Sequence, residues 1–303
     1  MRLCTANSRM MNCIDGRWLV NMVIQNNIAG FNASRNKGIT EGKMRKSLEK
    51  LSSGYRINRA GDDAAGLAIS ELMRNQITAL DQAMRNVNDG ISMTSTGEGA
   101  LSEVHSMLGR LKTLAIQSAN GTYTTLAREN LDAERMQLLD EIDRIGQTSD
   151  FDEIPLFDAT SALPTDYVPP EKKDDITLQI GASGDEILDV PRYYMSSKAL
   201  LLDDTDFTSL TASNEAVTKI DEAIEAVADI RASFGAAQNH LEHTHNNLSV
   251  TSENMTVSES QIRDTNMAEE FTSYTKDNIV YQASNSMVAQ ANSVPELILR
   301  LLQ

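Results

Sequence analysis

The longest regular pattern of apolar residues in the chain runs from Gly66 to Asn120. Apolar side chains recur there in steps of three and four residues, as they do along a helix that packs against other helices. The recurring positions are Ile69, Met73, Ile77, Leu80, Met84, Val87, Ile91, Leu101, Val104, Leu108, Leu111 and Ala115. At a rise of about 1.5 Å per residue, this proline-free stretch predicts a helix roughly 80 Å long. Such a helix needs partners elsewhere in the chain or in other copies of it.

Two features of this stretch predict departures from a continuous helix. Polar Thr94 and Glu98 occupy positions of the apolar stripe, beside Gly97 and Gly99, so we expect local unwinding or bending there. Gly121 follows the stretch directly and suits a left-handed cap that ends the helix.

Helical patterns also precede and follow the long stretch. Residues 22–50 predict a helix with a loose middle around Gly38 and Gly42. Residues 126–145 predict a helix, ended by Gly146, that lies antiparallel to the last third of the long one because the connection is short. Residues 214–262 and 267–301 return to the same pattern. Asp62 or Asp63 is expected to cap the helix that begins near Ala64.

The middle of the chain, residues 151–212, has a different composition. Five of the six prolines lie in one central stretch: Pro155, Pro164, Pro169, Pro170 and Pro191. Two β-type runs around Gly181 and Gly184 predict a hairpin over 176–190, and residues 151–158 contain a further short strand. The predicted fold is mainly α: a long coiled-coil-like hairpin of paired N- and C-terminal helices, with a small central β region capping the helices' end.

Composition excludes some partners. A formal charge of −16 and a pI near 4.7 argue against nucleic acid, whose binding needs clustered Lys and Arg. No apolar run reaches the length of a membrane span, which argues against membrane insertion. Residues 278–295 carry no charge at all. That pattern favours a helix buried among copies of itself, with its polar face toward a confined aqueous space.

The first 21 residues differ from the rest. They hold both cysteines, Cys4 and Cys13, and the only tryptophan, Trp18, but no uninterrupted apolar core typical of a secretory signal. A disulfide between the two cysteines is possible on paper. We interpret residues 1–21 as a non-native extension and expect the native protein to start at Met22.

The chain offers little catalytic chemistry. His240 and His243 share a helix face that is able to hold a metal, but His245 points elsewhere, and solvated histidines are the more frequent case. The sequence has no HExxH motif, which disfavours a filament with an embedded metallopeptidase. No Ser-His-Asp arrangement, phosphate loop or dinucleotide fingerprint is present. We therefore expect a protein that is not an enzyme and has no cofactor and no metal site.

Several motifs together resemble bacterial flagellin. They are LSSGYRINRAGDDAAGLAIS from Leu51, RNVNDGISM from Arg85, EGAL from Glu98, LKTLAIQSAN from Leu111, LDEIDRI from Leu139, SQIRDTNMAEE from Ser260 and QASNSMVAQANSVPELILRLLQ from Gln282. The match covers roughly 22–144 and 215–303, both ends in the right order.

The resemblance implies a filament subunit with an inner tube (22–65 and 259–303), a helical rod (66–150 and 213–258) and a short variable β region facing outside (151–212). It implies a homopolymer driven by apolar residues of the paired termini: Ile24, Ile28, Phe31, Met287, Ala291, Val294, Ile298 and Leu301. It also implies an extracellular location, unfolded passage through the flagellar type III export apparatus with a secretion chaperone, and contacts with filament cap and hook-junction proteins. The rival interpretation is a flagellar hook–filament junction adaptor, which shares similar terminal helices.

A stripe on the predicted rod resembles the receptor-binding positions of flagellins. Arg110, Leu114 and Gln117 are spaced i, i+4 and i+7, and Glu134 on the antiparallel helix flanks them. The resemblance implies binding to the flagellin-sensing Toll-like receptor. The equally weighted alternative is a contact between subunits, and the two are compatible if only monomers expose the stripe.

Overall fold

The computed structural model describes residues 13–14, 17–18, 26–158, 169–170 and 172–301. These residues form the helices α1 (Ile28–Ser53), α2 (Ala64–Ser118), α3 (Thr125–Thr148), α4 (Leu210–Arg263) and α5 (Met267–Leu301). They also form the short strands β1 (Cys13–Ile14), β2 (Arg17–Trp18), β3 (Asp150–Phe151), β4 (Ile154–Pro155) and β5 (Phe157–Asp158), and the longer strands β6 (Lys172–Gln179) and β7 (Ile187–Tyr194). Two compact units result, which we call unit 1 (Met1–Ser70 with Glu259–Gln303) and unit 2 (Glu71–Ser258).

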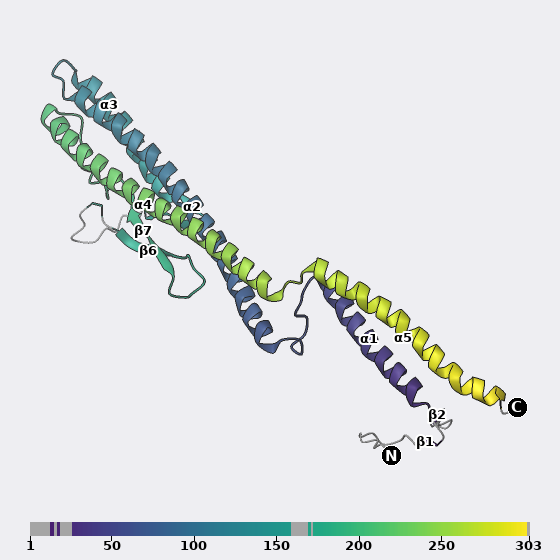
Figure 1. Ribbon diagram of the computed structural model, residues 1–303. Coiled ribbons are helices and arrows are strands. Elements are labelled where there is room, and N and C mark those ends of the chain that lie inside the picture. The colour runs from purple at the N-terminus through teal and green to yellow at the C-terminus, as the bar shows by residue number, and fades with distance from the viewer. Residues whose placement is uncertain (1–12, 15–16, 19–25, 159–168, 171, 302–303) are drawn as a thin grey trace. The chain divides into compact units, whose positions relative to one another are not determined.

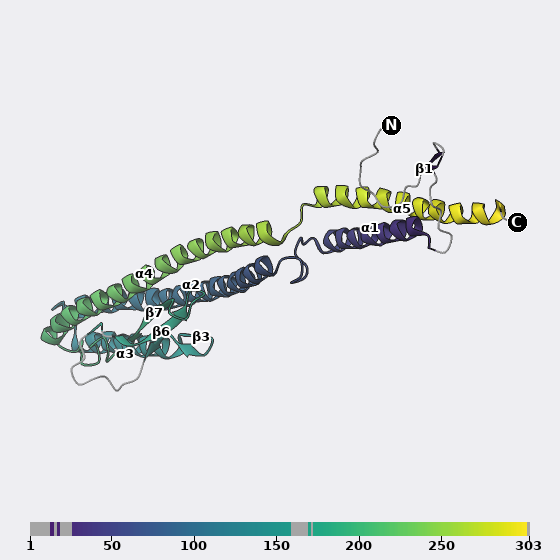
Figure 2. The same cartoon turned by 60° about the horizontal axis from the view of Figure 1, so that its bottom comes forward.

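Unit 1 is built around the first and the last helix of the chain. Helix α1 lies beside α5 and runs antiparallel to it, as both views of the ribbon make clear (Figures 1 and 2). The prediction that the two ends of the chain run together is therefore confirmed. Cys4, Met22 and Ile24 lie outside the described residues. Of the first 21 residues, the structure describes only the backbone of β1 and β2.

Unit 2 is a bundle of α2, α3 and α4 with a small sheet beside it (Figure 1). Its core is formed by the apolar stripe of α2 together with residues of the other elements. The largest buried side chains are Phe157, Phe207, Leu101, Leu108, Leu111, Leu114, Ile142, Leu156, Met195, Leu202, Ile220 and Ile230. The long helix predicted over 66–120 is present almost to the residue, and α3 follows it antiparallel as expected.

The predicted hairpin is present, but its position differs from the prediction. Strands β6 and β7 pair antiparallel with Ile176 opposite Val190, and β5 joins β7 in parallel. The sheet does not cap the end of the helices: Leu178 lies against Gly90, midway along α2, and the Phe157 ring lies 5.9 Å from that of Phe234 on α4. The sheet therefore packs against the side of the helical bundle, where Leu178 contacts α2 and Phe157 contacts α4.

Glycines do not interrupt the helices where interruption was predicted. Helix α1 continues through Gly38 and Gly42, because a helical glycine costs only about 1 kcal/mol relative to alanine and the packing against α5 offsets it. The expected unwinding of α2 near residues 94–99 is also wrong. The Thr94 hydroxyl donates to the carbonyl of Gly90 at 3.0 Å, and Glu98 pairs with Arg231 of α4 at 3.5 Å, so both polar groups are satisfied within a continuous helix.

The helix ends follow local chemistry that only partly matched the prediction. Asp63 caps α2, because its Oδ1 accepts the Gly66 N–H at 2.9 Å, as predicted. The left-handed cap is Gly54 at the end of α1, with φ of 77°, and not Gly121, whose φ lies outside that region. Helix α3 continues past the buried Gly146 to Thr148. Within the described part of the chain, no helix is both long and apolar enough to cross a membrane.

Candidate functional site

The pairing of α1 with α5 is made by polar side chains and backbone groups. Asn27 caps α1 by accepting the Gly30 N–H at 3.0 Å, and its side-chain amide donates to the carbonyl of Ala291 at 2.8 Å. Further along, Lys37 donates to Asn285 at 2.9 Å. These contacts fix the register of the two helices without burying a large apolar side chain.

Most of the large apolar side chains that the structure describes in α1 and α5 are exposed. The buried residues of α1 are Gly30, Thr40 and Ser47. By contrast, Phe31 is 71% exposed and Met287 is 66% exposed. Other exposed apolar residues of the two helices are Ile28, Ile39, Leu48, Met267, Phe271, Ile279 and Val280. Among the described side chains of α1 and α5, no large apolar one is fully buried, and the exposed ones form a surface that other helices would be able to bury.

The predicted polymerisation residues can be placed only in part. Ile28, Phe31 and Met287 are exposed, and Ala291 is half-buried. Val294, Ile298 and Leu301 belong to α5, but their side chains, like Ile24 as a whole, lie outside the described residues.

The loop between α1 and α2 is fastened to the turn between α4 and α5. The Arg56 N–H donates to the carbonyl of Arg263 at 2.7 Å, and the Thr265 N–H donates to the carbonyl of Gly54 at 2.9 Å. Asp62 pairs with Lys46 at 2.9 Å, and this hydrogen bond holds the pKa of the Asp62 carboxyl below its ordinary value. The conspicuous Asp pair of the sequence thus serves structure: one carboxylate caps a helix and the other fixes the loop.

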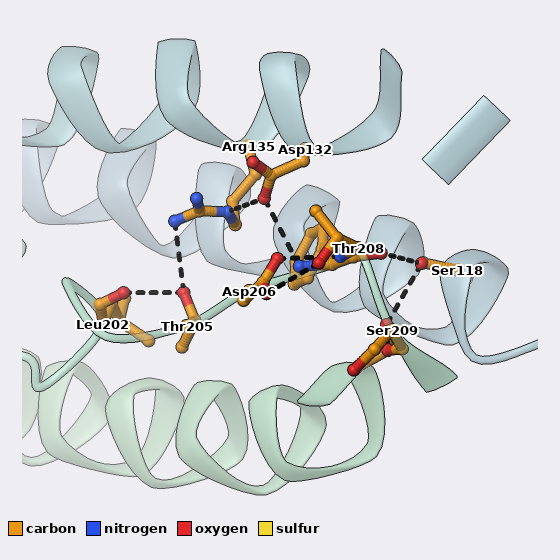
Figure 3. A network of polar contacts seen from close by, with 10 residues as sticks. Ser118, Asp132, Arg135, Leu202, Thr205, Asp206, Thr208 and Ser209 are labelled. Atoms are coloured by element: carbon orange, nitrogen blue, oxygen red, sulfur yellow. Dashed lines mark hydrogen bonds and ion pairs between the residues drawn. The ribbon is translucent and has the colours of Figure 1, made fainter. Parts of the chain in front are cut away.

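A buried polar network joins α2, α3 and the segment before α4 (Figure 3). Asp132 accepts from Arg135 Nε at 2.6 Å and from the Phe207 N–H at 3.3 Å. The Arg135 guanidinium lies over the Phe207 ring, 5.6 Å from its centroid, and Arg135 is 7% exposed. Ser118 donates to the Phe207 carbonyl at 2.6 Å and accepts from Ser213 at 3.0 Å.

Sequence reasoning missed this network. Arg135 occupies an ordinary charged position in α3, and the serines resemble solvated ones. The available signal was weak: Asp132 and Arg135 stand at i, i+3, a spacing that also fits a solvent-exposed ion pair.

The predicted receptor stripe is not one continuous exposed surface. Arg110 and Glu134 form an exposed ion pair at 2.7 Å, and Gln117 donates to the Tyr123 hydroxyl at 2.8 Å. Leu114, however, is fully buried in the core of unit 2. Helical spacing places Leu114 near Arg110, but packing in the bundle covers the leucine and leaves the longer arginine outside.

The histidines of α4 are not gathered into a site. His240 and His243 are exposed and His245 is half-buried. In the part of the chain that the structure describes, no three His, Cys, Asp or Glu side chains are grouped as a metal site requires. The absence of a metal site and of catalysis stays a prediction.

Comparison with known proteins adds a decisive observation. The family model for the bacterial flagellin N-terminal helical region matches residues 24–162, and that for the C-terminal helical region matches 217–302. A flagellin of Halalkalibacterium halodurans is 46% identical over 284 residues, covering 93% of this chain and 100% of that protein. The chain belongs to the flagellin family.

A second relative supports the same family. A flagellin of Bacillus subtilis is 42% identical over 306 residues, covering 93% of this chain and 100% of that protein. The crystal structure of Bacillus cereus flagellin has 32% identity and a TM-score of 0.46, covering 54% of this chain and 88% of that one.

The two matched regions correspond to the helical parts of the structure. The first contains α1, α2 and α3, and the second contains α5 and nearly all of α4, whereas the hairpin β6–β7 lies in neither. As a member of the flagellin family, the chain is a structural subunit of the bacterial flagellar filament, the fibre used for motility. The hook–filament junction alternative is not favoured.

Proposed function

We propose that the exposed apolar surface of the α1–α5 pair drives polymerisation by burying itself against copies of the same chain. The observation that carries the proposal is the reversed pattern of α1, with glycine, threonine and serine inside and Phe31 outside. Full burial of a side chain such as Phe31 or Met287 stabilises by about 1.5–3 kcal/mol. In a single chain these side chains stay exposed to water, whereas in a helical polymer they are buried in every subunit and stabilise the assembly.

The geometry of a filament fits such a surface. Copies that meet through two different faces form an open helical array when the rotation between neighbours does not close into a ring. The α1–α5 pair has apolar residues on both of its helices, so each copy is able to offer one helix to one neighbour and the other helix to another. Terminal segments with little core of their own then become ordered as they assemble.

The test replaces exposed apolar residues in the pair and compares them with a matched residue elsewhere. The variant Phe31→Ser/Met287→Ser is expected to remain a folded monomer, with the helical circular dichroism of the wild-type monomer, and to form no filaments in sedimentation and electron microscopy. Ile187→Thr is the control, because Ile187 is 48% exposed but lies on β7, outside the matched family regions. Normal filaments from the double variant would refute the proposal. Deletion of residues 284–303 should likewise abolish polymers.

The proposal extends to the route and the partners of the subunit. The flagellar filament is extracellular, so the chain leaves the cell, unfolded, through the flagellar type III export apparatus with a secretion chaperone. It then adds to a filament that begins at the hook-junction proteins and ends under the filament cap. The support is the resemblance of both chain ends to flagellin and the family membership.

A second function, recognition by the flagellin-sensing Toll-like receptor, is proposed for the surface around Arg110 and Glu134. Their ion pair spans α2 and α3 and is exposed on both sides, with side-chain exposures of 52% and 39%. Gln117 extends the same surface, whereas Leu114 supports it from within the core. The interface is thus centred on an arginine, a residue type enriched at binding hot spots.

A further inference from the structure

The turn between α2 and α3 contains the single Asn-Gly pair of the sequence, Asn120–Gly121. Helix α2 ends at Ser118 and α3 begins at Thr125, so both residues lie between the two helices, and both are exposed. The Asn120 N–H still donates to the Gln117 carbonyl at 3.3 Å. Glycine has no side chain to hinder its own backbone nitrogen. This nitrogen is the nucleophile that attacks the preceding asparagine amide in deamidation.

The Asn120 side chain is folded over the peptide group that follows it. Its Oδ1 accepts a hydrogen bond from the Thr122 N–H at 3.2 Å. This is an Asx turn, which closes a ring that contains both the asparagine Cγ, the electrophile, and the next backbone nitrogen, the nucleophile, and so limits the rotation of one relative to the other. The Thr122 N–H also polarises the Cγ–Oδ1 bond and stands where negative charge develops when Cγ is attacked.

The rest of the turn holds this geometry in place. The Asn120 carbonyl accepts from the Tyr123 N–H at 3.3 Å and from Arg128 Nη2 at 3.2 Å. Among the hydrogen bonds of the described residues, none engages the Gly121 N–H. The Gly121 N–H therefore donates to no acceptor among the described residues, while Asn120 and Thr122 on either side of it are held by hydrogen bonds.

We propose that Asn120 is a spontaneous modification site that converts to aspartate and isoaspartate in the folded protein. The Gly121 nitrogen, losing its proton to hydroxide or water, bonds to Asn120 Cγ, and the bond from Cγ to Nδ2 breaks with release of ammonia. Water then opens the cyclic imide at either of its two carbonyl carbons. The net reaction consumes one water, releases one ammonia, and needs neither enzyme nor oxidant.

The products change the turn in two ways. Aspartate adds a negative charge close to the Arg128 guanidinium, which is able to neutralise it. Isoaspartate routes the backbone through the former side chain and adds a methylene between residues 120 and 121. The connection from α2 to α3 then becomes longer, and the Asx turn is lost. A filament subunit that is not replaced accumulates both products with age.

The experiment follows all asparagine-containing tryptic peptides by high-resolution mass spectrometry, above all 113–128 with Asn120 and 86–110 with Asn88, while the purified full-length protein is incubated at neutral and mildly alkaline pH. Asn120 is expected to convert fastest of all asparagines and faster at higher pH. Asn88, within α2, is the internal control. Gly121→Ala is the matched variant, because an added Cβ meets nothing within 4 Å and the φ of Gly121 is not left-handed. Asn120 in the Gly121→Ala variant is expected to convert about tenfold more slowly than in wild type, which corresponds to an activation free energy about 1.4 kcal/mol higher.

A parallel incubation in urea separates the effect of the turn from that of the Asn-Gly sequence. The folded protein is expected to convert at least as fast as the unfolded chain. An Asn120 that stays intact in the folded protein while the unfolded chain converts would overturn the proposal, because the turn would then protect the residue. Equal rates for wild type and Gly121→Ala, with unchanged circular dichroism, would overturn it as well.

Discussion

Phe234 on α4 packs directly against Gly97 on α2, so that a Cβ added to Gly97 would lie 2.6 Å from Cε1 of the ring. Phe234 is 2% exposed and in contact with Phe157, so its ring has little room to move. This contact explains a glycine in the middle of a long helix: it admits an aromatic side chain of the neighbouring helix.

The first prediction uses the two neighbouring glycines of α2. Gly97→Ala is expected to lower the free energy of unfolding, because overpacking costs about 1–3 kcal/mol and exceeds the gain in helix propensity of about 1 kcal/mol. Gly99→Ala meets nothing within 4 Å and should raise the free energy of unfolding by about 0.5–1 kcal/mol. Urea denaturation of the monomer measures both. Equal effects of the two substitutions would contradict the role assigned to Phe234.

The second prediction concerns the buried arginine of the polar network. Arg135→Met keeps most of the side-chain volume but removes the donors to Asp132 and Thr205. We expect a loss of about 1–3 kcal/mol in the free energy of unfolding, because Asp132 loses a partner in a poorly hydrated position. Arg144→Met is the control, since its ion pair with Glu141 is exposed to solvent and therefore contributes little to stability. If Arg135→Met lowers the free energy of unfolding no more than Arg144→Met does, the hydrogen bonds of Arg135 do not stabilise the network.

The third prediction is a pH dependence at Asp206. The Thr208 backbone N–H and then its hydroxyl hold the pKa of the Asp206 carboxyl below its ordinary value of 3.8. Since the folded-state pKa is the lower one, the carboxylate contributes stability above pH 3.8, and this is lost as the pH falls through the folded-state pKa. The difference in unfolding free energy between wild type and Asp206→Asn should therefore be constant near neutral pH and shrink in acid. A difference that does not change with pH would show that Asp206 is not the group concerned.

The fourth prediction tests the receptor surface without disturbing the core. Arg110→Ala is expected to weaken binding of the monomer to the flagellin-sensing Toll-like receptor, measured by surface plasmon resonance. Leu114 is left unchanged, because truncation of a fully buried leucine costs about 2–5 kcal/mol and confounds the result. Arg144→Ala, at another exposed arginine with an ion pair, is the control. Unchanged binding of the Arg110 variant would identify the surface as a contact between subunits only.

The helices could be predicted from the sequence because their signals are local. The 3–4 spacing from Ile69 to Ala115 specifies one apolar face of α2, which is 47% exposed at Ile69 and buried at Leu80 and Ala115. Asp63 caps the helix by accepting the N–H of Gly66, three residues along the chain. The hairpin β6–β7 was likewise readable from two β-type runs around glycines.

What the sequence did not reveal depends on contacts between distant residues. Whether a glycine bends a helix or admits a ring depends on Phe234, which lies far along the chain from Gly97. Leu114 and Arg110 share a helix face, and only the packing of the bundle decides that one is buried and the other exposed. The same holds for Arg135, whose partners Thr205 and Phe207 come from a segment without a recognisable pattern.

The contact of Asn27 with Ala291 has a consequence for the order of events when the chain is delivered from its N-terminus. Because these residues are separated by nearly the whole sequence, α1 has no partner until the final helix has emerged. The contact of Asn27 with Ala291 is then among the last to form. A chain that stops just before residue 291 lacks the carbonyl that accepts this hydrogen bond, whereas the contact of Lys37 with Asn285 is still available to it. If the proposed polymerisation surface requires the complete pair, assembly is thereby linked to completion of the chain.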